Sequence, residues 1–330
     1  MTEMIKKILR KTLLLMGILV AMNFIYQYFF EEKDIQAHSE VINRVRNLPE
    51  DAEVVYVGES SNITNRSDDK DKRPISGFLA DYYPGLAVHD ITKTAAHAGI
   101  YYTLLANIPE ENNIETLVVT LNLRSFNAQW IYSDLETPLQ KSMVLLQDWP
   151  PLLNRTLLSF KAYDIKTPKE REAQFKRKWK KDRFDVPFRL PYRDVIAWDS
   201  YIGRNGILNE EGKRDQPKTE LACHYVKGYA FQIDFKHNPR IRDFDKIVKL
   251  SEKRGWKLVF NLLAENVEMA QILVGNNLTW FMRDNAKRLV DYYSAKGVIV
   301  VNNLEAVEDE QFIDRNWTTE HYAENLPKEQ

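Results

Sequence analysis

Short apolar runs separated by amphipathic stretches are the feature of this sequence that most restricts its fold. Five runs are present, at residues 54–57, 86–88, 117–121, 258–260 and 298–301. Continuous apolar runs of this length are typical of strands buried on both faces of a parallel sheet. Helical spacing of apolar residues occurs between most of them, at 97–107, 243–254 and 279–296. The alternation predicts an α/β fold of flavodoxin-like type, a three-layer α/β/α arrangement with a mainly parallel five-stranded sheet.

The N-terminal apolar run predicts a membrane anchor. Residues 12–30 carry no charged side chain, and a helix of that length spans about 28 Å, close to the hydrocarbon thickness of a bilayer. Basic residues precede the run, at Lys6, Lys7, Arg10 and Lys11. The positive flank predicts a cytoplasmic N-terminus and an extracytoplasmic domain. A cleaved signal peptide is the alternative, but no small-residue cleavage site follows the run, which favours a single-pass anchor in the cell membrane.

The spacing of the runs also predicts how the chain is divided. We expect residues 1–33 to form a cytoplasmic stub and transmembrane anchor, and residues 34–330 to form one α/β domain. The segment at about 125–240 is too long for one crossover, and we expect it to be a helical insertion that caps the crevice. Its basic run at 176–181 is either a solvated helix face or a contact for anionic lipid headgroups or an acidic glycan.

Composition excludes several classes of function. The formal net charge is -1, so no global field attracts nucleic acid, and we expect no nucleic-acid partner. Cys223 is the sole cysteine, which excludes an intramolecular disulfide and a cysteine-based metal site. The sequence contains neither a phosphate loop nor a dinucleotide fingerprint. Metal-ligand spacing is absent around His89, His97, His224 and His237. We therefore expect neither a metal nor a cofactor.

A serine follows the first predicted strand directly, in Gly58-Glu59-Ser60. In open α/β sheets, ligands bind beyond the carboxyl ends of the strands, so this serine is expected at the crevice. The first amides of a helix that begins there offer hydrogen-bond donors and positive potential for an oxyanion. Serine is also a common helix N-cap, so this motif by itself leaves both readings open.

Four sequence blocks, taken in order, resemble those of the SGNH (GDSL-like) hydrolases, a family of serine esterases and O-acyltransferases. Gly58-Glu59-Ser60 matches the first block, which implies that Ser60 is the nucleophile. Gly99 and Asn122 match the second and third blocks, which implies that they join Ser60 in the oxyanion hole. His321 matches the histidine of the last block. The resemblance covers roughly residues 51–130 and 240–322.

The sequence departs from the family pattern at two places. Thr318 stands where the family usually has an aspartate, three residues before the histidine, so Asp314 or Glu320 is the candidate for the acid that orients His321. Asp314 is preferred, because the side chains of adjacent residues such as Glu320 and His321 diverge. A Ser–His dyad oriented by a backbone carbonyl is the alternative. The third block lacks the family's leading glycine and its following aspartate.

Two further residues are candidates for binding substrate. Arg124 lies just beyond the third predicted strand, and Asn266 follows the fourth. Both are therefore expected on the crevice side of the sheet. For Asn266, a helix cap is at least as compatible with the sequence.

The resemblance and the anchor together predict an esterase or O-acyltransferase that acts on a cell-envelope glycan, in a bacterial periplasm. The expected partners are the lipid bilayer through residues 12–30, an acylated glycan or similar polymer, and a membrane acyltransferase. Hydrolysis and transfer share one mechanism, so the sequence leaves both open. The alternative is a non-catalytic SGNH-like scaffold or a partner subunit of an envelope complex, which the missing aspartate at 318 and the altered third block favour.

Overall fold

The computed structural model describes residues 2–38, 40–163 and 166–323, and the chain divides into two compact units. One unit contains Met1–Asn47 and Leu135–Ile165, and the other contains Leu48–Asp134 and Lys166–Gln330. The division differs from the expected boundary at residue 33, because 34–47 and 135–165 cluster with the anchor.

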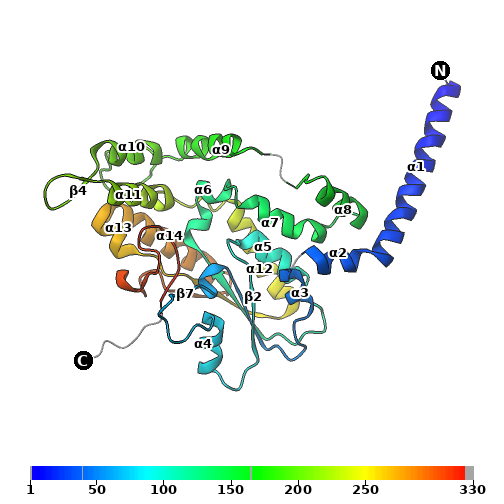
Figure 1. Ribbon diagram of the computed structural model, residues 1–330, viewed down its shortest axis with the longest axis horizontal. Helices are drawn as coiled ribbons and strands as arrows, with labels where there is room; N and C mark the ends of the chain where they lie inside the picture. The colour runs from blue at the N-terminus through cyan, green and yellow to red at the C-terminus, as the bar shows by residue number, and fades with distance from the viewer. Residues whose placement is uncertain (1, 39, 164–165, 324–330) are drawn as a thin grey trace. The chain divides into compact units, whose positions relative to one another are not determined.

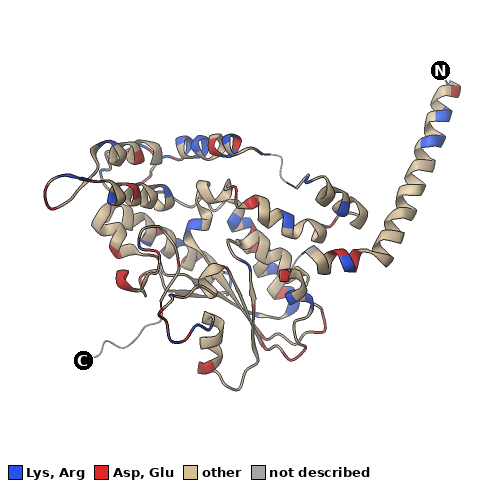
Figure 2. Ribbon diagram, in the orientation of Figure 1, with Lys and Arg blue, Asp and Glu red and all other residues tan. Residues whose placement is uncertain are grey.

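The first unit is helical, and its first helix is apolar. Its elements are α1 (Thr2–Phe29), α2 (Glu31–His38), α3 (Glu40–Arg46), α7 (Glu136–Met143), the 3-10 turn η3 (Val144–Leu146) and α8 (Pro151–Ser159). Helix α1 is long and apolar enough to cross a membrane, with a mean hydropathy of 1.8 over its most apolar window. Its charged side chains lie in its N-terminal part (Figure 2). These properties support the predicted single-pass anchor.

The second unit is built around a parallel sheet. Its strands are β1 (Val54–Gly58), β2 (Val88–Thr92), β3 (Thr116–Leu121), β6 (Lys257–Leu262) and β7 (Ile299–Asn302). Within the described residues these five strands are parallel and lie in the order β2-β1-β3-β6-β7 (Figure 1). The predicted fold class is confirmed, and each apolar run lies in or at the start of a strand. Strand β2 begins at the last residue of its run, because this edge strand is only half-buried and includes His89 and Asp90.

Helices cover the sheet and extend beyond it. They are α4 (Ile75–Tyr82), α5 (Ala98–Ala106), α6 (Ala128–Ile131), α9 (Pro168–Lys181), α10 (Val195–Asn205), α11 (Gln216–Tyr229), α12 (Pro239–Arg254), α13 (Val267–Leu273) and α14 (Asn276–Ser294), with 3-10 turns η1 (Ser60–Asn62), η2 (Leu123–Phe126) and η4 (Asp309–Gln311). Phe244 of α12 and Tyr293 of α14 both contact Phe260 of β6, so these helices share a face. Right-handed crossovers place α4 on the opposite face, as Figure 1 shows.

The aromatic part of the predicted insertion packs against α14, one of the helices that cover the sheet. Phe184 lies 5.0 Å from the ring of Phe281, and Phe188 lies 5.3 Å from that of Trp280, both on α14. A short hairpin of β4 (Ile207–Leu208) and β5 (Arg214–Asp215), which the sequence analysis did not predict, precedes α11. Part of the insertion, Leu135–Ile165, clusters with the first unit, and the aromatic stretch packs on α14. A cap over the crevice stays a prediction.

The strand order places one crevice between β1 and β3. Connections on the two sides of this point run in opposite directions, which opens the sheet at the carboxyl ends of the two strands. Val57 is paired with Val119 in the parallel register. Continuing this register by three residues brings Ser60 level with Asn122, although they are far apart in the sequence.

Two features fix the turn after β1: Gly58 lies close to the ring of Tyr56, and the side-chain amide of Asn62 is buried and hydrogen-bonded. A Cβ atom at Gly58 would lie 2.9 Å from the Tyr56 ring, so this position requires glycine. The Asn62 amide donates to Thr92 Oγ1 at 2.8 Å, and its carbonyl oxygen accepts from the backbone N–H of Ser76 at 3.0 Å. Asn62 thus connects the ends of β1 and β2 to the start of α4.

We expect Asn62→Ala to lower the free energy of unfolding by about 1–3 kcal/mol, because it leaves the buried N–H of Ser76 without an acceptor. Denaturant unfolding of the full chain in detergent measures this change. Asn65→Ala is the matched control, because Asn65 is exposed and should change the free energy little. Equal effects of the two substitutions would show that the buried bonds contribute nothing specific.

Candidate active site

Ser60 and His321 meet at the crevice although 261 positions separate them. Ser60 is the first residue of η1, directly beyond β1, and His321 lies in the loop after β7. The Oγ atom of Ser60 lies 3.0 Å from Nε2 of His321. This distance is within hydrogen-bond reach, as a hydroxyl nucleophile and its general base require.

Asp314 orients the histidine. Its Oδ2 atom lies 2.6 Å from Nδ1 of His321, and the hydroxyl of Thr319 donates to the same oxygen at 3.1 Å. The loop folds back on itself, since the N–H of Ile313 donates to the carbonyl of His321. This bond places Asp314 beside the imidazole. The geometry agrees with the preference for Asp314 over Glu320.

Arg124 and Glu320 form a buried ion pair rather than a substrate contact and a catalytic acid. Two guanidinium nitrogens of Arg124 donate to the two carboxylate oxygens of Glu320, and the two side chains are only 6% and 2% exposed. The guanidinium also lies 4.9 Å from the ring of Trp130. These contacts engage Nε and Nη2 of Arg124 and both carboxylate oxygens of Glu320, so they favour a structural role for the pair over the expected substrate contact and catalytic acid.

Two more carboxyl groups are buried around this single guanidinium. Burial raises the pKa of Glu265 well above its ordinary value, and the negative charge of Glu320 raises it further. Burial and Glu320 likewise raise the pKa of Glu59. Burying an unpaired charge is unfavourable, and Arg124 balances one carboxylate. Burial therefore favours the protonated form of both carboxyl groups, most strongly for Glu265, which also accepts a hydrogen bond from the hydroxyl of Tyr229.

Gly99 and Asn266 have structural contacts instead of the expected roles. The N–H of Gly99 donates to Nδ1 of His97 at 3.1 Å, so it is not free for an oxyanion. A Cβ atom at Gly99 would lie 2.9 Å from Oδ2 of Asp243, the end of a side chain that would have to move. Asn266 caps α13 through the N–H of Met269, and its amide donates to Asp309. The contact of Gly99 with His97 argues against an oxyanion role for its N–H, and Asn266 takes the helix-cap alternative.

The remaining oxyanion candidates have free donors. Ser60 occupies the first position of η1, where helical bonding leaves the amide unpaired. The side-chain amide of Asn122 has no hydrogen-bond partner among the described residues, and its oxygen is buried. Ala95 has a φ of 57°, in the left-handed region, within the loop after β2. The N–H of Lys93 ties this loop to the carbonyl of Gly58, beside the nucleophile turn.

Sequence reasoning missed Ala95 and the acidic cluster for different reasons. A positive φ at an alanine cannot be recognised from the sequence. Gly99 was favoured because the second block of the family pattern is a glycine. Strained backbone of this kind is concentrated at functional sites. Glu59 and Glu265 both lie within a few residues of the carboxyl end of a predicted strand, which is a signal that could have indicated them. Their burial depends on segments that are distant in the chain.

Part of the insertion borders the site loop through α11. The ring of His224 lies 3.8 Å from that of Trp317, three residues beyond Asp314. Burial lowers the pKa of His224, and the positive charge of Lys227 lowers it further. A neutral His224 therefore packs against the loop that carries the candidate acid and base.

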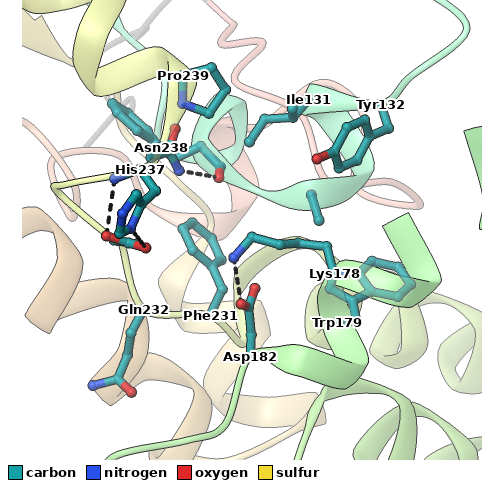
Figure 3. A pocket seen from close by; sticks show the side chains of 13 residues that line it. Ile131, Tyr132, Lys178, Trp179, Asp182, Phe231, Gln232, His237, Asn238 and Pro239 are labelled. Atoms are coloured by element: carbon teal, nitrogen blue, oxygen red, sulfur yellow. Dashed lines mark hydrogen bonds and ion pairs between the residues drawn. The ribbon is translucent and has the colours of Figure 1, made fainter. Parts of the chain in front are cut away.

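A separate pocket lies between α6, α9 and the turn before α12 (Figure 3). Its lining includes Trp179 and Phe231, and its charged groups are paired with one another. Lys178 contacts Asp182, and Nδ1 of His237 lies 2.9 Å from Asp234. None of the candidate active-site residues lines this pocket. In the part of the chain that the structure describes, no group of acidic, histidine or cysteine side chains is arranged to hold a metal.

No protein-family model matches the chain, and no curated protein is significantly similar to it. The assignment of the site therefore depends on its geometry and on the order of the four sequence blocks.

The raised pKa of Glu265 predicts a pH-dependent stability. An unfolded glutamate ionises above a pKa of about 4.3, while the folded protein keeps Glu265 protonated, so stability falls as pH rises towards the folded pKa. The slope is at most about 1.4 kcal/mol per pH unit. Glu265→Gln, which imitates the protonated side chain, should flatten this dependence.

Denaturant unfolding of the full chain in detergent between about pH 5 and about pH 9 measures the effect. The advantage of the Gln variant over the wild type should grow with pH. Glu211→Gln is the control, because Glu211 is exposed and should give a constant difference. Parallel pH curves for wild type and Glu265→Gln would contradict a protonated Glu265.

Proposed function

We propose that this protein is a serine esterase or O-acyltransferase of SGNH type, with Ser60, His321 and Asp314 as its catalytic residues. The observation that carries the proposal is the continuous contact from Ser60 Oγ to His321 Nε2 and from His321 Nδ1 to Asp314 Oδ2. A nucleophile, a base and an orienting acid in this arrangement perform acyl transfer on several unrelated folds.

In the first step, the oxygen of Ser60 attacks the carbonyl carbon of an acyl ester, and His321 accepts the hydroxyl proton at Nε2. Asp314 keeps the other ring nitrogen protonated and stabilises the imidazolium that forms. His321 then gives the proton to the departing alcohol oxygen as the ester bond breaks. The acyl group remains on Ser60 as an ester.

The hydroxyl of Ser60 can donate its proton to either Glu59 or His321. The protonation state of Glu59 therefore affects which acceptor it uses before substrate binds. Ser60 donates to Oε2 of Glu59 at 2.9 Å and also lies within reach of His321. A protonated Glu59 donates its own proton to Oγ of Ser60 instead. The hydroxyl proton is then directed to His321, so burial of Glu59 supports the catalytic pair.

The negative charge of the tetrahedral intermediate needs donors that are in place before the reaction. The Ser60 amide and the side-chain nitrogen of Asn122 are the first two. No described residue accepts a hydrogen bond from the N–H of Ala95, which makes it a better third candidate than Gly99. The left-handed backbone conformation of Ala95 costs about 1–2 kcal/mol of conformational free energy. A role in directing the Ala95 N–H towards the oxyanion would explain why this cost is kept.

In the second step, His321 removes a proton from an acceptor hydroxyl, whose oxygen attacks the acyl carbon and frees Ser60. Water as the acceptor makes the protein an esterase, and a sugar hydroxyl makes it a transferase. The anchor favours a substrate at a membrane surface, and the basic flank of α1 favours a cytoplasmic N-terminus. We therefore propose that it acts outside the cytoplasm, on an acylated cell-envelope glycan. A membrane acyltransferase that supplies acyl groups is the proposed partner.

Labelling by a fluorophosphonate probe tests the proposal, with the full chain purified in detergent. The wild type should be labelled at Ser60, and Ser60→Ala should not. Turnover of p-nitrophenyl acetate should fall about 10⁶-fold in Ser60→Ala or His321→Ala, and about 10⁴-fold in Asp314→Asn, which removes only the orienting charge.

His237→Ala is the matched control, because His237 forms an exposed pair with Asp234 that resembles the His321–Asp314 pair only locally. It should leave labelling and turnover unchanged. A wild-type chain that is folded, unlabelled and inactive would favour the non-catalytic scaffold.

Asn122→Ala tests the oxyanion hole. Loss of one preorganised donor should lower kcat for the same ester about 10²–10³-fold, while KM changes little, because the bond forms mainly in the transition state. Steady-state kinetics measure both constants, with Asn65→Ala as the control. A variant with unchanged kcat would exclude Asn122 from the oxyanion hole.

A further inference from the structure

Helix α8 of the first unit presents a row of apolar side chains to its surroundings. Leu153, Leu157 and Phe160 recur at intervals of four and three residues, so they lie along one face. Leu153 is 45% exposed and Phe160 is 80% exposed, while Leu157 is half-buried. Trp149, just before the helix, is 54% exposed. One flank of the helix is covered, because Asn154 and Leu158 are buried.

The same helix is attached to the end of the anchor, within the same unit. The Oδ1 atom of Asn23 on α1 accepts a hydrogen bond from the N–H of Leu152 at 3.0 Å. This N–H belongs to the first turn of α8, where it has no partner inside the helix. Nε of Arg155 lies 2.7 Å from Asp34, which also accepts from the hydroxyl of Tyr26 at 2.8 Å. Helix α8 is therefore held beside residues 23–34.

The position of Asn23 determines the depth of α8 in a bilayer. Asn23 lies inside the apolar run 12–30, seven residues before its end, which corresponds to about 10 Å along the helix. A helix attached at that level reaches about 5–10 Å into the boundary between headgroups and acyl chains, the depth of interfacial amphipathic helices. The charges of Asp34 and Arg155 neutralise each other, which lowers the cost of placing them at the boundary between headgroups and acyl chains.

We propose that α8 is a second membrane contact, an interfacial helix whose apolar face of Trp149, Leu153, Leu157 and Phe160 lies in the leaflet from which α1 emerges. The occupant of this face is lipid, because the face continues the surface of a helix that itself crosses the bilayer. The inference rests on the proposed anchor and is independent of the acyl-transfer chemistry. It means that the unit holds the chain to the membrane by a helix that crosses it and a helix that lies in it.

Site-specific quenching of the full chain tests the proposal. Single cysteines replace Leu153, Phe160 or Ser159 in a Cys223→Ser background, carry a bimane label, and are reconstituted in phosphatidylcholine vesicles with or without a 5-doxyl lipid. Labels at 153 and 160 should be quenched by the doxyl lipid at least about twofold more strongly than the label at 159. Ser159 is the matched control, since it is exposed on a different face of the same helix.

Aqueous iodide and a label on the anchor separate the outcomes. The labels at 153 and 160 should be protected from iodide, and a label at Leu19→Cys should be quenched by the doxyl lipid. Iodide access at 153 equal to that at 159 would place the face in water and overturn the proposal. Protection from iodide without doxyl quenching would indicate a protein on this face and would also overturn it. If Leu19 escapes doxyl quenching, the anchor fails first, and the proposal fails with it.

Discussion

The buried pair of Arg124 and Glu320 is the interaction on which the candidate site depends. The segment after β7 has little regular structure, yet it carries both Asp314 and His321. Glu320 precedes His321 directly, and Arg124 lies two residues beyond Asn122. The pair therefore ties the segment that carries His321 to the end of β3, beside Asn122. Removing one partner of such a buried pair typically costs about 3–5 kcal/mol, because the other charge stays buried without compensation.

The same pair sets the charge balance beneath the nucleophile. Arg124 is matched by one carboxylate, and burial together with the charge of Glu320 raises the pKa of Glu59 and of Glu265. The raised pKa of Glu59 disfavours a negative charge beside Ser60. The site is thus organised by desolvation as much as by direct contact.

Much of the sheet and part of the site were predictable from local sequence. The apolar runs mark all five strands, although the edge strand β7 is largely exposed. The other edge strand, β2, was located less well, because it is half-buried and contains His89 and Asp90. Ser60, Asn122 and His321 were assigned from the order of the four family-like blocks, and the contact between Ser60 and His321 supports that assignment. The N–H of Gly99 is instead bound by His97, two residues before it, and Arg124 is bound by Glu320, which is distant in the chain.

By itself the sequence determined the parallel sheet, the helices that cover it and an apolar helix long enough for a bilayer. These follow from side-chain periodicity, which acts over a few neighbouring residues. The sequence favoured Asp314 over Glu320, but only the tertiary structure showed Asp314 against His321 and Glu320 paired with Arg124, 196 positions away. The tertiary structure also decided that α8 belongs with the anchor and that Glu59 is buried. Desolvation and ion pairing depend on which distant segments meet, and local sequence does not contain that information.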